Sequence, residues 1–477
     1  MKIIIIGAGF TGGLLAKALV AEGNNVVLID NNAELVRSVG DQLDCTVIEA
    51  DGNSIETLEK AGISSADALV ALTHNDEANM IVCSLVDAIY PNILKIARVR
   101  NYDYYMRMMD VAKRIGAKDL SRAMLGIDHV INPDVEAAGS MMRAMEIGAA
   151  GSAVELGGDY GIVTLPVIEG SPIVGKKLRN LSEIEGWKFL IAFVENEEGT
   201  FLANGETLLA AGDHIGVLVH KESVAQLLKY TSADTTPMNR IVIFGADNIS
   251  ALTVAAQMEK INPMKKRFFS FSRAKRELIV IDKDLKRCNE LAEKFPEARI
   301  LNGDITDDGL IQGEGICNCD LMVAASGNYE RNLLTSAYLK LRGVKKVISL
   351  TSDSAFDEIA GKLGVDVTVP MRDVVIDTIM SHLRGRNIKA VHSVGGRKFE
   401  IVSCEISLYS KVAGKKLSEI KGLENCLVLL VQQPGSESRE VPCGNTVMTA
   451  GARVVLIVPS GDLDTMKKFA GKTEIEV

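Results

Sequence analysis

Short apolar runs of strand length alternate with longer amphipathic stretches of helix length through the first part of the chain. The apolar runs span Lys2 to Ile6, Asn25 to Ile29, Cys45 to Glu49, Ala68 to Leu72 and Leu94 to Val99. Strands that alternate with helices in this way pair in parallel, with the helices covering the faces of the sheet. The pattern therefore predicts an α/β fold with a Rossmann-like, doubly wound parallel sheet.

A helix is predicted directly after Pro133, over Asp134 to Ile147. It carries an apolar stripe at helical spacing, made of Val135, Ala138, Met141, Met142 and Met145. Such a stripe is typical of a packing surface. We expect this helix to pack either within the chain or between chains.

The remainder of the first half has the pattern of a smaller α+β unit. Strand-like runs cover Gly161 to Val167, Lys188 to Glu195 and His214 to His220, and a helix is predicted from Glu222 to Tyr230. A polar linker then runs from Thr231 to Met238.

The whole pattern is then repeated. The spacing from Asp51 to Asp67 recurs between Asp304 and Asp320, and Gly-Lys-Lys-Leu at 175–178 returns at 414–417. The duplication predicts four lobes, in the order large, small, large, small. The expected ranges are 1–133 for the first Rossmann-like lobe, 134–149 for its crossover helix, 150–231 for the first small lobe, 239–370 for the second Rossmann-like lobe, 371–387 for the second crossover helix and 388–472 for the second small lobe.

A glycine-rich fingerprint, Gly7-Ala8-Gly9-Phe10-Thr11-Gly12, follows the first predicted strand. Gly7 permits a tight turn, Gly9 lets a phosphate approach the backbone, and Gly12 lets the next helix pack closely against the sheet. The helix that begins near Phe10 and Thr11 directs its N-terminal N–H groups at the anion. The fingerprint predicts a dinucleotide or adenosine site.

Asp30 ends the second predicted strand, where its carboxylate can accept hydrogen bonds from both ribose hydroxyls. A glycine turn without a ligand would not explain this residue. Asn31 and Asn32 follow it in place of an arginine, so nothing adjacent would neutralise a 2′-phosphate. NAD or NADH is therefore favoured over the phosphorylated cofactor.

Further candidates follow the third and fourth strands, at the edge where doubly wound sheets bind ligands. Asp51 comes after the third strand, and Thr73 comes after the fourth. We expect both residues to border the nucleotide. Asp76, Glu77 and Asn79 fit a ligand role or a turn or helix start equally well.

Two arginines, Arg98 and Arg100, stand at the end of the fifth predicted strand. Their alternate spacing in a strand places both side chains on one face of the sheet. At the binding edge they would point toward the phosphates.

The second copy of the fingerprint is broken. It reads Gly245-Ala246-Asp247-Asn248-Ile249-Ser250, so Asp247 and Ser250 replace the second and third glycines. If a gap is allowed, Ser349 and Thr351 replace the two arginines. An aspartate repels a phosphate, so we expect one strong nucleotide site per chain, in the first copy.

The second copy also carries an insertion, from Asn262 to Arg276, in which basic residues are interleaved with Phe268, Phe269 and Phe271. This composition fits either an anionic surface, such as lipid headgroups or a partner protein, or a solvated loop.

The charge balance and the apolar runs exclude several classes of protein. The chain has 477 residues with 53 basic and 62 acidic side chains, a net charge of -9, which argues against a nucleic-acid partner. No apolar run approaches the roughly 18 residues of a membrane span. The 8 cysteines lack the spacing of a zinc site or a CxxC motif and fit a reduced cytoplasm.

These motifs resemble those of the TrkA family, the peripheral subunits of bacterial Trk potassium uptake systems, which are built from tandem RCK units (regulators of potassium conductance). The resemblance covers essentially the whole chain. It is carried by the fingerprint at 7–12, Asp30, the stretch from Thr73 to Asn79, Ala97-Arg98-Val99-Arg100 and the repeated Gly-Lys-Lys-Leu.

The resemblance implies regulation rather than catalysis. Members of this family bind NAD or NADH and ATP or ADP in their large lobes, form homotetramers and dock on a membrane-embedded potassium-translocating subunit. By this resemblance the chain would be cytoplasmic, held at the inner face of the cell membrane through its partner. Gly7, Gly9, Gly12 and Asp30 would seat the nucleotide, and the helix after Pro133 would be the family's dimer-forming crossover segment.

Two other functions stay open at this point. A nucleotide-responsive regulator of another cation channel or antiporter would differ only in its partner. An NAD-dependent dehydrogenase would need a proton-handling residue near the nicotinamide, and His74, beside Asp76, is the only plausible candidate.

Overall fold

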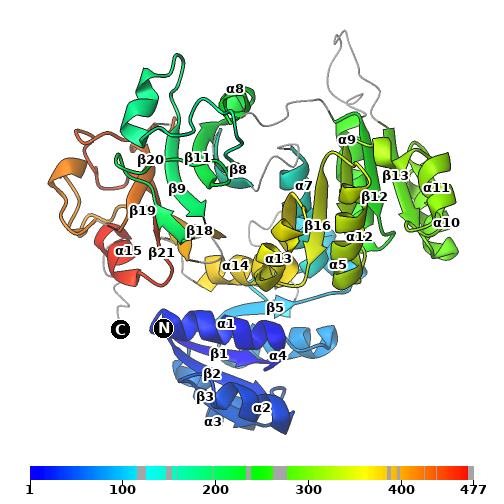
Figure 1. Cartoon of the computed structure of the whole chain (residues 1–477). Coiled ribbons are helices and arrows are strands. Elements are labelled where there is room, and N and C mark those ends of the chain that lie inside the picture. Colours follow the sequence, from blue (N-terminus) through cyan, green and yellow to red (C-terminus); the bar gives the residue numbers. More distant parts are fainter. Residues whose placement is uncertain are drawn as a thin grey trace. The chain divides into compact units, whose positions relative to one another are not determined.

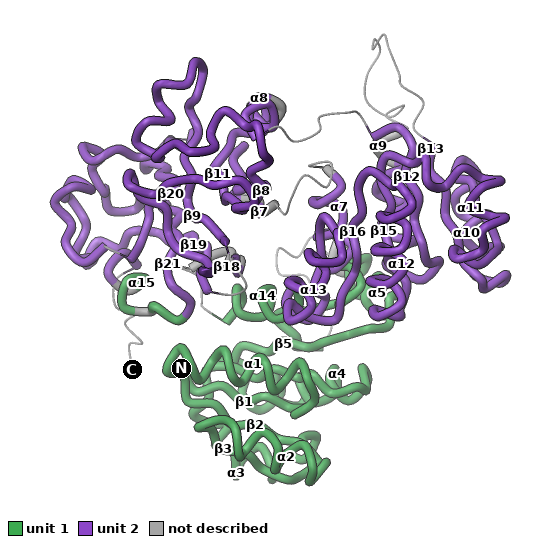
Figure 2. The backbone as a smooth tube through the Cα atoms, viewed as in Figure 1, with its two compact units in different colours: residues 1–136, 374–391, 461–467 green, residues 137–373, 392–460, 468–477 purple. Residues whose placement is uncertain are grey.

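The structure is a computed structural model, and its backbone forms two compact units (Figure 2). Unit 1 comprises residues 1–136, 374–391 and 461–467, and unit 2 comprises 137–373, 392–460 and 468–477. The residues described are 1–114, 125–146, 153–157, 159–196, 198–231, 238–261, 277–383, 388–394, 398–423, 425–436 and 438–470. The basic insertion expected at 262–276 lies outside them.

Unit 1 is built on a six-stranded parallel sheet in the order β3-β2-β1-β4-β5-β6, as the alternating pattern predicts (Figure 1). Its strands are β1 (Lys2–Ile6), β2 (Asn25–Asp30), β3 (Thr46–Glu49), β4 (Ala68–Ala71), β5 (Leu94–Arg98) and β6 (His129–Ile131). Its helices are α1 (Phe10–Ala21), α2 (Ala33–Gly40), α3 (Ile55–Lys60), α4 (Asp76–Ile89) and α5 (Tyr102–Arg114), with a short 3-10 turn η1 (Ile63–Ser65). The short strand β6 was not anticipated, because three residues give no readable alternation.

Successive residues of β1 enter opposite cores, as the period of a strand requires. Ile3 and Ile5 pack with Leu15 and Leu19 of α1 on one face. On the other face, Ile4 and Ile6 pack with the buried residues of α3 and α4, which are Leu58, Val82, Cys83 and Val86. The first lobe is therefore a three-layer sandwich.

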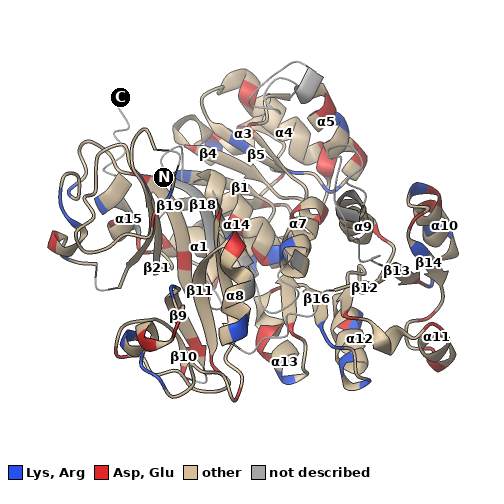
Figure 3. Cartoon of the chain, turned by 90° about the horizontal axis from the view of Figure 1, so that it is seen from above, with Lys and Arg blue, Asp and Glu red and all other residues tan. Residues whose placement is uncertain are grey.

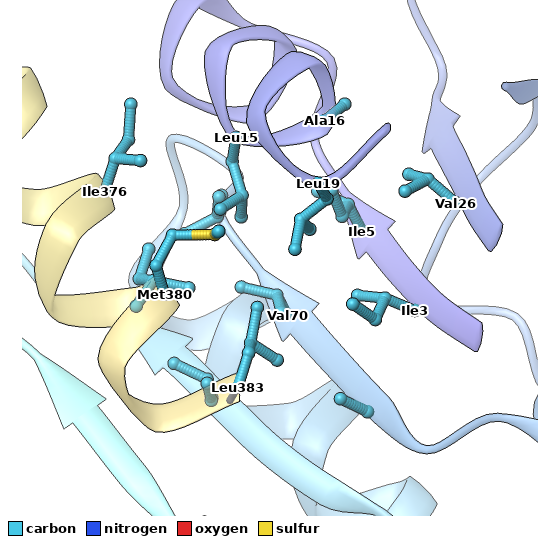
Figure 4. Packing of buried hydrophobic residues seen from close by; sticks show 14 of the residues in the cluster. Ile3, Ile5, Leu15, Ala16, Leu19, Val26, Val70, Ile376, Met380 and Leu383 are labelled. Carbon is cyan, nitrogen blue, oxygen red and sulfur yellow. The ribbon is translucent and has the colours of Figure 1, made fainter. Parts of the chain in front are cut away.

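A helix from the second half of the sequence completes the first core. α14 (Met371–Leu383) contributes Val375, Ile376, Ile379, Met380 and Leu383 to the cluster around α1 and β1 (Figure 4). Near the middle of α14, Thr378 Oγ1 lies 3.1 Å from Glu136 Oε2 of α7 (Pro133–Glu146). The second crossover helix thus packs within the chain, on the first copy.

The first crossover helix meets the second copy. In α7, Met141 is fully buried, and the sulfurs of Met142 and Met145 lie 3.6 and 3.7 Å from the amide nitrogen of Gln257. Gln257 belongs to α9 (Asn248–Ile261) of the second Rossmann-like lobe. The methionine stripe is therefore a packing surface, as its composition indicates.

The second Rossmann-like lobe, in unit 2, repeats the first with the parallel order β14-β13-β12-β15-β16-β17. Its strands are β12 (Arg240–Phe244), β13 (Glu277–Asp282), β14 (Arg299–Asn302), β15 (Leu321–Ala324), β16 (Val347–Thr351) and β17 (Val367–Pro370). Besides α9, its helical elements are α10 (Leu285–Lys294), α11 (Asp308–Gly313), η4 (Ile316–Asn318), α12 (Tyr329–Leu341), η5 (Ser354–Phe356) and α13 (Asp357–Lys362). Acidic and basic side chains both occur on α10, α12 and α13 (Figure 3).

Two small lobes share one core in unit 2. Their sheets have the orders β10-β9-β11-β8-β7 and β18-β19-β21-β20. The strands are β7 (Ala153–Gly157), β8 (Tyr160–Pro166), β9 (Leu190–Asn196), β10 (Gly199–Leu202), β11 (His214–His220), β18 (Ile388–Val394), β19 (Phe399–Glu405), β20 (Leu427–Gln432) and β21 (Arg453–Pro459). The helical elements are η2 (Leu178–Glu183), η3 (Lys221–Ser223), α8 (Val224–Tyr230), η6 (Leu417–Glu419) and α15 (Leu463–Ala470). Phe193 and Leu218 of the first sheet pack with Leu430, Val455 and Ile457 of the second.

Candidate functional site

The glycine turn of the first lobe has the geometry that its sequence predicts. Gly7 has a φ of +107°, and a Cβ there would stand 3.0 Å from the backbone of Leu72 and Thr73. A Cβ on Gly12 would stand 1.9 Å from the carbonyl oxygen of Gly7. On Gly9 it would meet no atom of the described chain within 4 Å, so the space beside Gly9 is open.

The N-terminus of α1 faces this opening without a side-chain cap. Its N-cap residue is Gly9, which has no side chain to accept from the first turn. The three helices that follow β2, β3 and β4 are capped by the side chains of Asn32, Ser54 and Asn75. The first turn of α1, at Phe10 and Thr11, is thus the helix end in this lobe that is shaped to receive an anion.

Asp30 supports the turn itself, which corrects our interpretation of it as explicable only by a ligand. Its Oδ2 accepts the N–H of Ala8 at 2.6 Å, and its Oδ1 accepts the N–H of Asn32 at 2.8 Å. In the second copy, Asp282 accepts from Ala246 and Asp284 in the same way, at 2.8 Å each. Since the degenerate copy keeps this aspartate, Asp30 alone does not diagnose a nucleotide site.

Asp51 lies at the end of β3 with its carboxylate exposed. Its Oδ1 accepts from the backbone and side-chain amides of Asn53, at 3.0 and 3.1 Å. The neighbouring Gly52 is required by packing, because a Cβ there would stand 2.3 Å from the Cγ2 of Ile6. Asp51 is therefore held at the binding edge of the sheet in reach of a polar ligand.

Thr73 and Asn79 form a clasp between β4 and β5. Asn79 is fully buried, accepts from the Thr73 N–H and hydroxyl at 2.9 and 2.7 Å, and donates to the carbonyls of Thr73 and Arg98 at 3.0 and 2.9 Å. These four bonds use the whole hydrogen-bonding capacity of its amide. Asn79 therefore holds Thr73 and Arg98 in position, and its amide has no hydrogen bond left for a ligand.

Arg98 and Arg100 differ sharply in their surroundings. Arg98 is only 7% exposed, donates to the Thr73 carbonyl at 2.8 Å, and has a buried Nε without a partner among the described residues. Arg100 is exposed. Burial, followed by the charge of Arg100, lowers the pKa of Arg98 to about 10. An anion bound beside these two arginines would offset the repulsion between them.

Asp76 is one of the residues at this edge whose role the sequence left open. It is the first residue of α4 and is 9% exposed. Its Oδ2 accepts the N–H of Asn101 at 2.7 Å, whereas its buried Oδ1 has no partner in the described chain. In the sequence, Asp76 could be recognised only as an acidic residue in the first turn of a predicted helix. Acidic residues are common at that position on protein surfaces, so the pattern did not indicate a buried carboxylate.

In the second copy, Asp247 occupies the end of the helix where an anion would bind. Its Oδ1 lies 3.5 Å from the N–H of Ser250, in the first turn of α9, so a resident carboxylate faces this turn. The buried hydroxyl of Ser250 donates to the Ala325 carbonyl at 3.2 Å. This geometry agrees with the expected loss of phosphate binding.

The strand register corrects the residues that replace the arginines. In the first lobe Ala71 pairs with Ala97, and in the second Ala324 pairs with Ser349. The fully buried Leu350 therefore stands where Arg98 stands in the first copy. The residues that replace the two arginines are therefore Leu350 and Ser352, not Ser349 and Thr351. The alignment with a gap was shifted by one residue, and the pairing of the strands fixes the correct register.

The described helices contain no segment long and apolar enough to cross a membrane. Fold and site together define a chain made of two tandem nucleotide-binding-type modules. The TrkA-N domain family matches residues 3–133 and 269–370, and the TrkA-C domain family matches residues 162–232 and 401–471. The chain belongs to the TrkA family of Trk system potassium uptake proteins.

Relatives of nearly full length support this assignment. One Trk system potassium uptake protein TrkA homolog 1 of Methanosarcina mazei is 29% identical over 476 residues, which cover 98% of this chain and 100% of the relative. TrkA of Azorhizobium caulinodans is 27% identical over 475 residues and 98% of each chain. The GsuK RCK domain crystal structure shares the fold, with a TM-score of 0.56 at 18% identity, covering 98% of this chain and 94% of that one.

Proposed function

We propose that this protein is the nucleotide-sensing regulatory subunit of a potassium uptake system. It binds one nucleotide per chain in the first Rossmann-like lobe and gates a membrane-embedded potassium-translocating subunit. The observation that carries the nucleotide site is Arg98, a buried cation with an unpartnered Nε beside a second arginine. A folded protein keeps such an unfavourable arrangement where an anion compensates for it.

Each element of the site has a part in this proposal. The N–H groups at Gly9, Phe10, Thr11 and Gly12 receive the phosphates, with Gly7 making the turn. Asp30 and Asp51 accept from the ribose, Thr73 borders the ligand, and Arg98 and Arg100 neutralise the phosphates. Asn79 holds Thr73 and Arg98 in place.

The ligands we propose are NAD or NADH and ATP or ADP. Asn31 and Asn32 after Asp30 favour the cofactor without a 2′-phosphate. One solved channel with the same fold, at a TM-score of 0.55 and 16% identity, is described as the GsuK channel bound to NAD. In the second lobe, Asp247 and Leu350 oppose a phosphate, so we expect no tight nucleotide there.

The assembly we propose is a homotetramer at the cytoplasmic face of the cell membrane, held there by its potassium-translocating partner. A ring can change state only through a difference in ligand affinity between its states. Moving a two-state equilibrium from 1:99 to 99:1 takes about 5.5 kcal/mol, which four sites share at about 1.4 kcal/mol each. A few arginine contacts that differ between nucleotides supply a difference of this size.

Calorimetric titration of the full chain with NAD, NADH, ATP and ADP tests the proposal. We expect one site per chain for at least one of these ligands. Arg100→Ser, which copies Ser352 of the second lobe, should narrow the difference in affinity between ATP and ADP. Arg37→Ser is the matched control, because Arg37 is exposed in the same lobe on α2. Two sites per chain, or no binding of any of the four, would refute the proposal.

Two further assays separate the other functions. Incubation with NADH and a panel of 2-keto acids should give no sustained loss of NADH absorbance, since His74 is exposed and no dehydrogenase chemistry is part of the proposal. Co-purification from membranes should recover a potassium-translocating protein. A different cation channel or antiporter in that complex would replace the proposed partner while leaving the nucleotide site intact.

A further inference from the structure

We propose that Asp76 determines which nucleotides the first lobe prefers, by acting as the resident counter-charge of Arg98 that the ligand's phosphates displace. This inference rests on the proposed nucleotide site and adds a residue that opposes binding. Its consequence is selection by phosphate charge.

The position of Asp76 is fixed from two sides. It opens α4 directly after the cap residue Asn75, whose side chain accepts the N–H of Ala78 at 2.7 Å. One carboxylate oxygen accepts the N–H of Asn101 at 2.7 Å, which ties α4 to the residue that follows Arg100. Asp76 thus holds the segment that carries both arginines.

The second carboxylate oxygen of Asp76 makes no hydrogen bond within the described chain. It is buried, and the Nε of Arg98 is in the same condition. The negative charge of Asp76 partly offsets the effect of burial and of Arg100 on the pKa of Arg98. Contacts through Thr73 also connect the two residues, because Arg98 donates to the Thr73 carbonyl at 2.8 Å and the Thr73 hydroxyl donates at 3.1 Å to the carbonyl of Asn75, the residue before Asp76. Asp76 and Arg98 each keep a buried polar atom that can take another partner.

Comparison of the two copies shows that the structural contacts around Asp76 and Arg98 are kept in the second copy, whereas Asp76 itself is not. Asn332 repeats the clasp of Asn79, with bonds to Ser326 at 2.8 and 3.1 Å, and Asp282 repeats the role of Asp30. Tyr329, the residue after the cap Asn328, stands in the place of Asp76 and donates its hydroxyl to the sulfur of Met371 at 2.7 Å.

Both charged members of the pair are thus absent from the second copy, where Tyr329 and Leu350 replace them. The fold persists without them, so neither charge is needed to build the sheet or its edge. Since Asp76 is lost together with Arg98 while the clasp and the turn are retained, its role belongs to the ligand site rather than to folding.

A phosphate that approaches Arg98 must do so against the charge of Asp76. This repulsion grows with the charge of the ligand, so it weakens binding of ATP more than of ADP, and of ADP more than of NAD. Asp76 accordingly acts against the two arginines and sets how strongly the site favours highly charged nucleotides.

Asp76→Asn tests this inference, because asparagine keeps an oxygen for the N–H of Asn101 and removes the charge. In calorimetric titrations at low ionic strength we expect the affinity for ATP to rise on the order of tenfold, with a smaller gain for ADP and the smallest for NAD. The gain should shrink as salt is added. Glu59→Gln, on the exposed surface of α3, makes the same change in net charge and should leave the three affinities in their original ratio.

The outcomes separate this inference from the function on which it rests. Binding by the unaltered protein with unchanged ratios in Asp76→Asn would overturn the role of Asp76 alone. An equal loss of affinity for all three ligands in that variant would show that Asp76 only holds Asn101, and would also overturn it. Absence of binding in both proteins would overturn the nucleotide site and this inference together.

Discussion

A lysine is completely buried in the first lobe, and its removal should destabilise that lobe strongly. Lys95 is the second residue of β5, which lies inside the sheet between β4 and β6. Its side chain has no exposed area, and its Nζ lies 2.6 Å from Asp87 and 3.6 Å from Asp128. It also donates to the Pro91 carbonyl at 3.2 Å. We expect Lys95→Val to leave two partly buried carboxylates without their cation.

The size of the effect follows from that burial. Removing one partner of a buried ion pair costs about 3–5 kcal/mol, because the remaining charge stays desolvated. Since each 1.4 kcal/mol is about tenfold in an equilibrium constant, the protection of the slowest amides of β4 and β5 should fall by about a hundred- to several-thousand-fold. Hydrogen–deuterium exchange of the full chain measures this loss lobe by lobe, where a single melting temperature would mix the lobes.

The second copy supplies both a control and a rescue. There Val347 stands at the position of Lys95, and the cation has moved to α12, where Lys340 lies 2.7 Å from Asp366. Lys340 is 25% exposed, so Lys340→Met should cost less, under about 2 kcal/mol. The double variant Lys95→Val with Asp87→Lys recreates this arrangement and should regain much of the lost protection. Unchanged exchange in Lys95→Val, or a double variant no better than the single one, would refute the reasoning.

Three further perturbations have clear expected outcomes. Gly12→Ala places a Cβ 1.9 Å from the Gly7 carbonyl oxygen, so α1 must shift and nucleotide binding in calorimetry should be lost, whereas Ser250→Ala should leave binding unchanged. The rings of His129 and His382 stack 3.7 Å apart, and burial followed by the charge of His129 lowers the pKa of His382 to about 4. As the pH falls, His382 is protonated in the unfolded chain before it is protonated in the folded protein, which favours unfolding. The protection of the α14 amides from exchange should therefore fall as the pH drops from about 6.5 toward about 4, and His382→Phe should remove this pH dependence. Burial raises the pKa of Asp357 to about 6, although the hydrogen bond from Thr368 acts in the opposite direction. The folded protein therefore loses stability as the pH rises from about 3.8 through about 6, and Asp357→Asn should slow amide exchange in α13 at neutral pH but not in acid.

The sequence was most informative where short-range chemistry decides the outcome. Strands β1 to β5 and the sheet type follow from apolar runs such as Ile3 to Ile6, which must be buried on both faces. Gly7 and Gly12 were identified with their reasons, since a positive φ and a close approach leave no choice of residue. The degeneracy of the second fingerprint was likewise legible from Asp247 alone.

Tertiary structure decided what depends on partners distant in the chain. Asp30 was expected to be explicable only by a ligand, but its hydrogen bond from Ala8 shows that it also supports the turn. Asn79 fitted either a ligand contact or the start of a helix, and its hydrogen bonds to Thr73 and Arg98 show that it holds these two residues. The counterpart of Arg98 was misplaced by one residue until the pairing of β15 with β16 fixed it. The residue types of Asp30 and Asn79 could not show these bonds, because a carboxylate or an amide suits a ligand and a backbone group equally well.

The sequence by itself determined that the chain is a duplicated α/β protein with one intact and one broken anion-binding turn, because periodicity and glycine requirements are local properties. Only the tertiary structure showed that α14 completes the core of the first lobe. It alone showed that Arg98 and Asp76 are both buried and that each has a polar atom without a hydrogen-bond partner among the described residues. Burial arises from contacts between segments far apart in the sequence, and those contacts decide which hydrogen-bond partners each residue has.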